Sequence, residues 1–403
     1  MLRYMTTGES HGRAVIAVVE GMPSGLLLTP ATIDVDLKRR QGGYGRGGRM
    51  KIESDRVELL SGVRGSRTLG SPITLQVTNR DWENWTDAMD PEKSSTGPRA
   101  VPVTRPRPGH ADLTGALKYA QTDVRNILER SSARETAARV AAGAAAKRLL
   151  EEFGIDIYSW VTEVGGVKWN RARSAKETPA ALYKRAEASV MRCPGKSATE
   201  KMKSCIKSAK EAGDSIGGIF KVVATGVPPG LGSHVQWDRK LNARLTCALA
   251  SVQAIKGVEV GMGFECGSLP GSKVHDEIYY SKKAAGNSAK GFWPQSPRFF
   301  RHTNNAGGIE GGMSNGEVIE LSAVMKPIPT LYKPLRSVDI KSKRTFEASV
   351  ERSDTCAVPA AAVVGEAVVA FELAVAFLDK FGGDSMKEIT RNYKGYLKQI
   401  AAY

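Results

Sequence analysis

The hydrophobic pattern of the N-terminal region predicts short strands and one helix. Residues 73–77 alternate between apolar and polar positions, which is typical of a strand with one buried face. Residues 14–19 form an apolar run, and residues 57–63 are also predicted to be a strand. A helix is expected over residues 29–38, which open with threonine and proline, because proline is well suited to a first helical turn.

Two units of a helix followed by a strand are predicted further along the chain. In the first, an alanine-rich helix covers residues 133–153 and a strand covers residues 155–164. In the second, an apolar stripe predicts a helix that ends at Gly257, before a strand over residues 258–260. The stripe consists of Leu241, Leu245, Leu249, Val252 and Ile255. The similarity of the two units suggests an internal pseudo-duplication.

A third long helix is predicted over residues 358–381, within the most apolar part of the chain. It contains Glu366 and Glu372, which are costly in a bilayer, so we interpret it as a buried helix and not as a membrane span. Three apolar helices among short alternating strands indicate an α+β fold, with helices sandwiched between antiparallel sheets.

Length and charge add one unusual segment to this picture. With 403 residues, of which 41% are apolar, the chain can bury a substantial core in one large domain or two. The formal charge is +16, and residues 168–210 hold 12 Lys/Arg against 3 Asp/Glu. Residues 168–215 are lysine-rich and weakly amphipathic, and Pro179 and Pro194 divide them, so they are predicted to be a basic, solvent-facing helical excursion. A flavin-reductase or nucleic-acid role is the alternative for this segment.

The cysteines and the N-terminus indicate the compartment. The five cysteines are scattered and lack metal-ligand spacing, so neither a disulfide framework nor a metal site is expected. Residues 1–3 lead directly into a candidate motif, which leaves no room for a signal peptide. A reducing cytoplasm is therefore the expected location.

Residues 105–112 are a candidate for acid–base chemistry. Two prolines and Gly109 precede His110 and impose an extended, turned backbone. A histidine exchanges its proton near neutral pH, and Arg105 and Arg107 offer positive charge beside it. The simpler alternative is an ordinary loop histidine.

Residues 130–135 predict an anion-binding helix start. Ser132 and Glu135 have the spacing of a capping box, and an alanine-rich sequence follows them. A helix N-terminus flanked by Arg130 and Arg134 attracts anions. The alternative is that Ser132 is only a helix cap.

Two glycine-rich segments near the N-terminus carry further candidates. Residues 8–12 place Ser10 and His11 between glycines, which allow another group to approach closely, although a surface-turn histidine is the alternative. Residues 39–49 carry four arginines, whose guanidinium groups match phosphate and carboxylate. This second segment is predicted to be a lid over a phosphorylated small molecule; the alternatives are a nucleic-acid contact and a solvated loop.

Three segments nearer the C-terminus also have polar groups on turns. Residues 304–316 form a glycine-rich loop that matches neither the Walker pattern nor the dinucleotide fingerprint. Residues 326–330 offer a lysine and a threonine on a proline-stiffened turn. Arg352 and Asp354 precede the third helix, and a surface ion pair is the alternative for them.

These segments resemble the signatures of the chorismate synthase family. The resemblance rests mainly on residues 8–12, 107–112 and 130–135, and it extends over residues 4–375. Members of this family convert 5-enolpyruvylshikimate 3-phosphate to chorismate and phosphate with reduced FMN and no net redox change. The resemblance implies a layered β-α-β sandwich in a single catalytic domain over residues 1–403, assembled as a homotetramer. It leaves open whether NADPH or a separate flavin reductase supplies the electrons.

The resemblance also implies residue roles. His11 is expected to protonate the departing phosphate, His110 to set the charge of the reduced flavin, and Asp354 to assist flavin N5 in taking the ring proton. The substrate anions or NADP are expected to contact Ser10, Arg40, Arg46, Arg49, Arg107 and Arg134. FMN is expected to contact Arg130, Ser131, Ser132, Gln253, Ala254, Gly311, Lys326, Pro327, Ile328, Pro329, Thr330 and Arg352. Asparagine is also familiar in this family at the position of Gln253.

The basic charge and the arginine–glycine segment allow one alternative function, a nucleic-acid-binding protein. The basic segments lack interleaved aromatic residues and any recognition motif. Catalysis on a phosphorylated small molecule, with no nucleic acid and no membrane as partner, is therefore the preferred interpretation.

Overall fold

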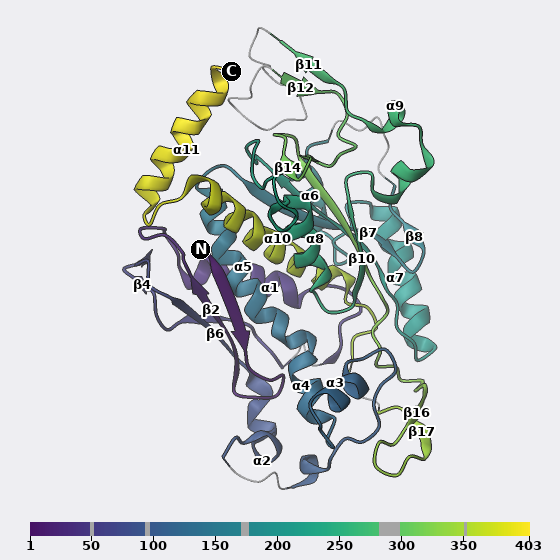
Figure 1. The fold of residues 1–403 in the computed structure, drawn as a ribbon. Coiled ribbons are helices and arrows are strands. Elements are labelled where there is room, and N and C mark those ends of the chain that lie inside the picture. Colours follow the sequence, from purple (N-terminus) through teal and green to yellow (C-terminus); the bar gives the residue numbers. More distant parts are fainter. Residues whose placement is uncertain (49–51, 93–96, 171–176, 282–298, 350–352) are drawn as a thin grey trace.

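The computed structural model describes residues 1–48, 52–92, 97–170, 177–281, 299–349 and 353–403. Its main elements are two antiparallel sheets and several long helices (Figure 1). The smaller sheet has the order β1-β2-β6-β3 and consists of β1 (Arg3–Thr7), β2 (Ala14–Glu20), β6 (Ile73–Thr78) and β3 (Val57–Leu59). Alternate residues of β2 and β6 are buried, so the strands predicted from these two patterns are confirmed.

The larger sheet has five strands in the order β10-β15-β9-β7-β8. They are β10 (Ile255–Val260), β15 (Ile319–Met325), β9 (Gly218–Thr225), β7 (Asp156–Val164) and β8 (Val167–Lys168). All neighbouring strands in this sheet are antiparallel. The mixed class of helices with antiparallel sheets is therefore as predicted.

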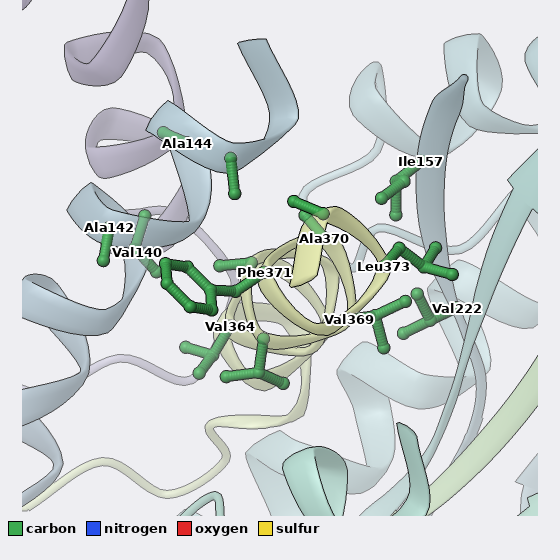
Figure 2. Close-up of a cluster of buried hydrophobic side chains, with 14 of the residues drawn as sticks. Val140, Ala142, Ala144, Ile157, Val222, Val364, Val369, Ala370, Phe371 and Leu373 are labelled. Atoms are coloured by element: carbon green, nitrogen blue, oxygen red, sulfur yellow. The ribbon is translucent and has the colours of Figure 1, made fainter. Parts of the chain in front are cut away.

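Three helices form the interior between the sheets: α1 (Pro30–Gln41), α5 (Thr136–Glu151) and α10 (Val358–Phe381). Helix α5 packs on β2 and β6, whereas α10 packs on β7 and β9. Figure 2 shows Phe371 of α10 beside Val140 of α5, with Ile157 and Val222 of the larger sheet on the other side of α10. The hydrophobic core is thus continuous from one sheet through the helices to the other.

Close packing of α5 against α10 depends on small residues. A Cβ atom on Gly143 would lie 2.4 Å from the Cβ of Ala367, so only glycine fits at this crossing. Helix α10 is long and apolar enough to cross a membrane, but 89% of its apolar 18-residue stretch is buried inside the protein. Its bounds and its burial confirm the predicted core helix.

The remaining elements are shorter or lie further out. The strands are β4 (Val63–Arg64), β5 (Arg67–Thr68), β11 (Ile278–Tyr280), β12 (Phe299–Arg301), β13 (Ile309–Glu310), β14 (Met313–Ser314), β16 (Arg336–Val338) and β17 (Thr345–Glu347). The α-helices are α2 (Thr86–Met89), α3 (Asp112–Lys118), α4 (Arg125–Ser131), α6 (Pro179–Glu187), α7 (Lys196–Glu211), α8 (Leu241–Ala250), α9 (Gly271–Val274) and α11 (Met386–Ala401). Short 3₁₀ helices cover Arg80–Asn84, Pro98–Ala100, Ala133–Glu135, Trp237–Arg239 and Gly263–Ser268.

Two predicted boundaries are wrong. The strand expected over residues 57–63 is divided into β3 and β4, because the chain turns at Gly62, which has φ +78°. The helix expected to end at Gly257 ends at Ala250 as α8, and Gly257 lies inside β10, next to a shift in strand register. The predicted apolar stripe therefore includes residues of α8 and the first residue of β10. Both helix–strand units exist, and their pseudo-duplication stays a prediction.

The basic excursion is less solvent-facing than predicted. It contains α6 and α7, and both helices turn an apolar side inward while their lysines face outward. Leu182 packs with Trp160 on the larger sheet, and Ile206 belongs to the main core. Arg192, between the two helices, is also buried. The lysine-rich composition concealed this inner face.

Candidate active site

The turn between β1 and β2 carries Ser10 and His11. Gly8 has φ +101°, and a Cβ atom there would lie 2.2 Å from the carbonyl oxygen of Ala14, so the turn requires glycine. The backbone N–H of Ser10 donates to the carbonyl oxygen of Glu129 at 3.0 Å. This bond fixes the turn against α4.

His11 is held from three sides. Its Nδ1 lies 2.9 Å from Oε1 of Glu129, and its backbone N–H donates to Oε2 of the same carboxylate at 2.8 Å. The imidazole is stacked on Trp85 with 4.0 Å between ring centres, and its Nε2 lies 4.0 Å from Oδ2 of Asp81. A carboxylate accepts hydrogen bonds, so Glu129 favours the tautomer with a proton on Nδ1 and directs Nε2 toward Asp81.

The predicted helix start lies directly beside this turn. Ser132 Oγ donates to Ser10 Oγ at 3.0 Å and accepts from the backbone N–H of Arg134 at 3.3 Å. Arg130 donates to the carbonyl oxygen of Gly8 at 3.1 Å. Ser131 is in the last turn of α4, where its hydroxyl donates to its own helix. The structure therefore brings the segment of residues 8–12 and the segment of residues 130–135 together.

The capping-box prediction is only partly right. Ser132 caps the short 3₁₀ turn, but the carboxylate of Glu135 does not return to it, because α5 begins only after Glu135. Glu135 instead accepts from Thr6 at 2.7 Å, Arg139 at 3.0 Å and Gln253 at 2.9 Å. Burial raises the pKa of Glu135, but the charge of Arg139 and these hydrogen bonds hold it below its usual range.

Arg40 and Arg134 converge on Asp55, and all three are buried. Nη1 of Arg40 donates to Oδ2 of Asp55 at 3.0 Å, Arg134 bonds the other oxygen, and Glu53 lies 3.6 Å from Arg134. Burial lowers the pKa of Arg40 to about 10 against the effect of Asp55, so the guanidinium is charged at neutral pH. Asp55 and Glu53 thus hold Arg40 and Arg134 in place. The contact of these two arginines with substrate stays a prediction.

The second histidine lies on a loop before α3. Nδ1 of His110 is hydrogen-bonded to Oδ1 of Asp112 and lies 3.1 Å from Nη2 of Arg107. Arg107 also donates to Oδ2 of Asp112 at 2.9 Å and to Oγ1 of Thr330 at 3.0 Å. Burial raises the pKa of Asp112, but the hydrogen bonds from His110 and Arg107 outweigh it and hold this pKa well below its usual range.

Residues 326–330 follow β15 and contact the His110 loop. Nζ of Lys326 donates to the carbonyl oxygen of Gly109, and its backbone N–H donates to the carbonyl oxygen of Ala254 at 2.9 Å. Burial and the nearby charge of Lys256 lower the pKa of Lys326. The structure therefore brings this segment, Ala254 and His110 together.

Gln253 has an unsatisfied acceptor. Its Nε2 donates to Glu135, and because that carboxylate accepts only, the amide oxygen must face the other way. This Oε1 is buried and has no hydrogen-bond partner within the part of the chain that the structure describes. A buried acceptor without a donor is costly, so this atom is suited to a ligand N–H.

Not all the predicted flavin residues meet within one chain. Gly311 lies in the turn between β13 and β14, and the neighbouring Gly312 accepts from the backbone of Leu241 at the start of α8. Gln253 and Ala254 follow the other end of α8. A helix of ten residues spans about 15 Å, so α8 separates Gly311 from them.

Arg46 and Gly47, in the segment of residues 39–49, are joined to the segment before α10. Nη1 of Arg46 lies 2.8 Å from Oδ2 of Asp354, whose other oxygen accepts from the backbone N–H of Gly47 at 2.6 Å. Arg49 and Arg352 lie outside the described residues. Arg46 and Asp354 thus form one unit, although they are 308 positions apart (354 − 46) in the chain.

Several functional neighbours were missed by the sequence reasoning. Asp112 lies within the signature of residues 107–112, and only its role as the partner of His110 was overlooked. Glu129 directly precedes Arg130, but the sequence gives no signal that it contacts His11 from 118 positions away. Trp85 and Asp81 come from a separate segment and had no motif at all.

Comparison with known proteins identifies the family of this chain. The family model described as "Chorismate synthase" matches residues 2–378. The chain is 57% identical to "Chorismate synthase" of Geobacter metallireducens over 100% of both chains, and 59% identical to that of Pelobacter propionicus over 99% of both. A solved structure named "Crystal Structure of Chorismate Synthase" is similar with a TM-score of 0.78 at 42% identity, covering 100% of this chain and 99% of the other. The chain therefore belongs to the chorismate synthase family.

Proposed function

We propose that this chain removes phosphate from 5-enolpyruvylshikimate 3-phosphate to give chorismate, with reduced FMN as its cofactor. The observation that carries the proposal is the pair His11 and His110, each with Nδ1 held by a carboxylate. This elimination has separate proton tasks, and a histidine with a fixed Nδ1 offers its Nε2 to one partner at a time. Family membership supports the same reaction.

Cations on three segments are available for the substrate's anions. Arg46 and Arg107 are partly exposed, and we assign them to direct contact with phosphate or carboxylate. Arg40 and Arg134 are buried, but Arg40 donates to the carbonyl oxygen of Ala133, next to Ser132. Asp55 and Glu53 offset the charge of these two arginines, which therefore act by holding the helix start in place, where a phosphate would accept from backbone N–H groups.

The residues predicted for FMN fit a flavin. The free Oε1 of Gln253 suits a ring N–H, and Lys326 together with the hydroxyl of Thr330 suits the anionic end of the cofactor. Gly311, at the far end of α8, would be supplied by another copy of the chain, as an oligomer such as the expected homotetramer would allow. When bound, the reduced flavin lends electron density to the allylic system and recovers it, so no net oxidation occurs.

The proton-handling residues have distinct positions in this proposal. His11 donates from Nε2 to the departing phosphate, while Glu129 stabilises the charged ring. His110 holds or releases a proton beside the flavin site. Both oxygens of Asp354 are occupied by Arg46 and Gly47. Held in this way, the carboxylate of Asp354 would assist flavin N5 in taking the ring proton.

The same proposal covers the wider organisation of the protein. The continuous core supports a single catalytic domain, and α5 and α10 between the two sheets support the layered β-α-β sandwich. We assign the enzyme to the cytoplasm as a soluble homotetramer. Electrons for the flavin come from NADPH or from a separate reductase.

An anaerobic assay tests the proposed function. Purified protein is mixed with 5-enolpyruvylshikimate 3-phosphate and photoreduced FMN, and chorismate and phosphate are measured. The expected result is equal amounts of both products with catalytic amounts of flavin. A parallel reaction with oxidised FMN and NADPH shows whether the chain reduces its own flavin. Retention on DNA, with neither flavin binding nor chorismate formation, would favour the nucleic-acid alternative and overturn the proposal.

A further inference from the structure

The basic excursion contacts the arginine loop, which is defined here as residues 42–48. The backbone N–H of Tyr44 donates to the carbonyl oxygen of Val190 at 2.9 Å. A Cβ atom on Gly45 would lie 3.1 Å from Cβ of Cys356 and 3.2 Å from Cγ2 of Ile206, so the loop backbone rests both on the segment before α10 and on α7. Nζ of Lys203 lies 5.9 Å from the centre of the Tyr44 ring. The side of the excursion that faces the protein therefore meets the arginine loop itself.

The end of the excursion contacts two other segments of the candidate site. The backbone N–H of Ile216 donates to the carbonyl oxygen of Thr355 at 2.9 Å, and Thr355 in turn donates to Gly45 at 2.9 Å. Ser215 donates to the carbonyl oxygen of Ile328 at 2.6 Å. One continuous piece of chain thus touches the neighbour of Asp354, the arginine loop and the segment of residues 326–330.

A buried ion network anchors the excursion and α1 at the same carboxylate. Glu366 of α10 is 1% exposed and accepts from Arg192 of the excursion at 3.1 Å. The same carboxylate accepts two hydrogen bonds from Arg39 of α1, at 2.7 and 2.8 Å. Arg39 also donates to Glu187 of α6 at 3.0 Å. Breaking a buried charge pair is strongly unfavourable, so the excursion and the helix that leads into the arginine loop are fixed relative to each other.

We propose that residues 177–215 of the excursion, together with the adjoining Ile216, are a brace that positions the arginine loop for substrate binding. The inference rests on the proposed role of Arg46 as a substrate contact. Arg46 directly follows Gly45, which Ile206 and Cys356 support from two sides, so the placement of its guanidinium depends in part on Ile206. A loop that is ordered before binding loses less entropy when it binds an anion. The brace acts through Arg46 and is a positioning element, with no contact to the reacting atoms.

Two matched cavity variants test the brace. Ile206→Ala removes the support beneath Gly45, whereas Leu182→Ala removes an equally buried side chain of the excursion that packs on the larger sheet. Binding of 5-enolpyruvylshikimate 3-phosphate is measured by calorimetry with oxidised FMN present, so that no turnover occurs. We expect Ile206→Ala to weaken substrate binding about tenfold and Leu182→Ala less than twofold. Both should lower the thermal midpoint similarly, and both should bind FMN without substrate as the parent does.

The outcomes separate the brace from simple stability and from the proposed function. Equal substrate affinities in Ile206→Ala and Leu182→Ala would overturn the brace, because the excursion would then contribute only stability. If Ile206→Ala does not fold, Ile206→Val replaces it. We then expect a smaller loss of substrate affinity, and an unchanged substrate affinity would overturn the proposal. Arg46→Ala is measured in parallel. If it binds substrate normally, the assigned role of Arg46 fails, whatever the cavity variants show.

Discussion

The two histidines of the candidate site are held in different ways, one by residues distant in the sequence and the other by its sequence neighbours. His11 is fixed by Glu129 and Trp85, which come from distant parts of the sequence and are brought to it by the smaller sheet and α4. His110 is fixed by Asp112 and Arg107, which lie two and three positions away on the same loop. The first site depends on tertiary packing, and the second is built almost entirely by one short segment.

This difference predicts different mechanical behaviour. The partner of His11 is a buried carboxylate with only 2% of its side chain exposed, and the ring is covered by an indole, so its position is set before substrate arrives. The loop of His110 is tied to residues 326–330 through Arg107 and Lys326. Because those contacts involve predicted flavin residues, cofactor binding is expected to adjust the second histidine and leave the first unchanged.

The largest effects are expected from replacing the histidines themselves. A positioned acid or base contributes about 10²–10⁴ in rate, so His11→Ala and His110→Ala should each lose roughly that factor. The His11→Ala protein should bind FMN normally and expel phosphate slowly. The His110→Ala protein should show an altered near-ultraviolet spectrum of reduced FMN in the ternary complex before turnover. Rapid mixing under anaerobic conditions measures both properties.

Equal rate losses with identical flavin spectra would contradict this division of roles. In that case the two histidines would share a single electrostatic function, and the contrast between their surroundings would have no catalytic meaning. Circular dichroism of each variant provides the control. Neither change should unfold the protein, since neither ring belongs to the hydrophobic core.

A smaller effect is expected when the partner of His11 is changed. Glu129→Gln keeps the shape but removes the charge, and a hydrogen bond to a charged group contributes about 1.5–3 kcal/mol. We expect kcat/KM to fall about 10- to 100-fold. Glu9→Gln, an exposed change on the same turn, is the matched control and should change kcat/KM far less. An unchanged kcat/KM in Glu129→Gln would show that Glu129 only fills space.

These residues also show what could be read from the sequence. The fold was predictable where the periodicity is local: the bounds of α10 agree at both ends, and β2 and β6 agree within one residue. Asp112 could be identified from the sequence, because it lies within the motif of residues 107–112. Glu129 and Trp85 could not be identified, because only the assembled fold brings them to His11, and Glu129 is 118 positions away from it.

The excursion shows a second limit. Its lysines dominate the composition and indicate a solvated surface, whereas Ile206, Met202 and Arg192 determine how it packs. A few buried side chains among many exposed ones leave only a weak periodic signal. The contacts with Val190 and Thr355 are made by backbone groups, which no residue pattern records.

The local site of His110 predicts an effect on stability with a defined sign. The pKa of Asp112 is depressed in the folded protein, so its ionised form contributes stability that is complete above the unfolded value of about 3.9. This stability is lost as the pH falls through the folded value. Asp112→Asn should therefore flatten the acid side of the stability curve below about pH 4, and should destabilise the protein at neutral pH. Urea unfolding at several pH values measures this. A parallel acid limb in the variant and the parent would exclude Asp112 as its source.

The smallest effect tests whether the fixed side of the site reaches the flavin. Gln253 donates to Glu135, which also binds Thr6 of β1, so its free Oε1 is oriented by the same packed elements that hold the turn of His11. Gln253→Leu removes this acceptor, and a neutral hydrogen bond contributes about 0.5–1.5 kcal/mol, so FMN affinity should fall about 2- to 12-fold when substrate is present. Gln253→Asn keeps the amide one methylene shorter and should lose less. Gln253→Leu also removes the donor to Glu135, so thermal unfolding of the variant measures any packing defect separately from the change in FMN affinity. If Gln253→Leu bound FMN as tightly as the parent in the ternary complex, the orphaned oxygen would have no ligand. The packed elements that hold the turn of His11 would then have no role in flavin binding.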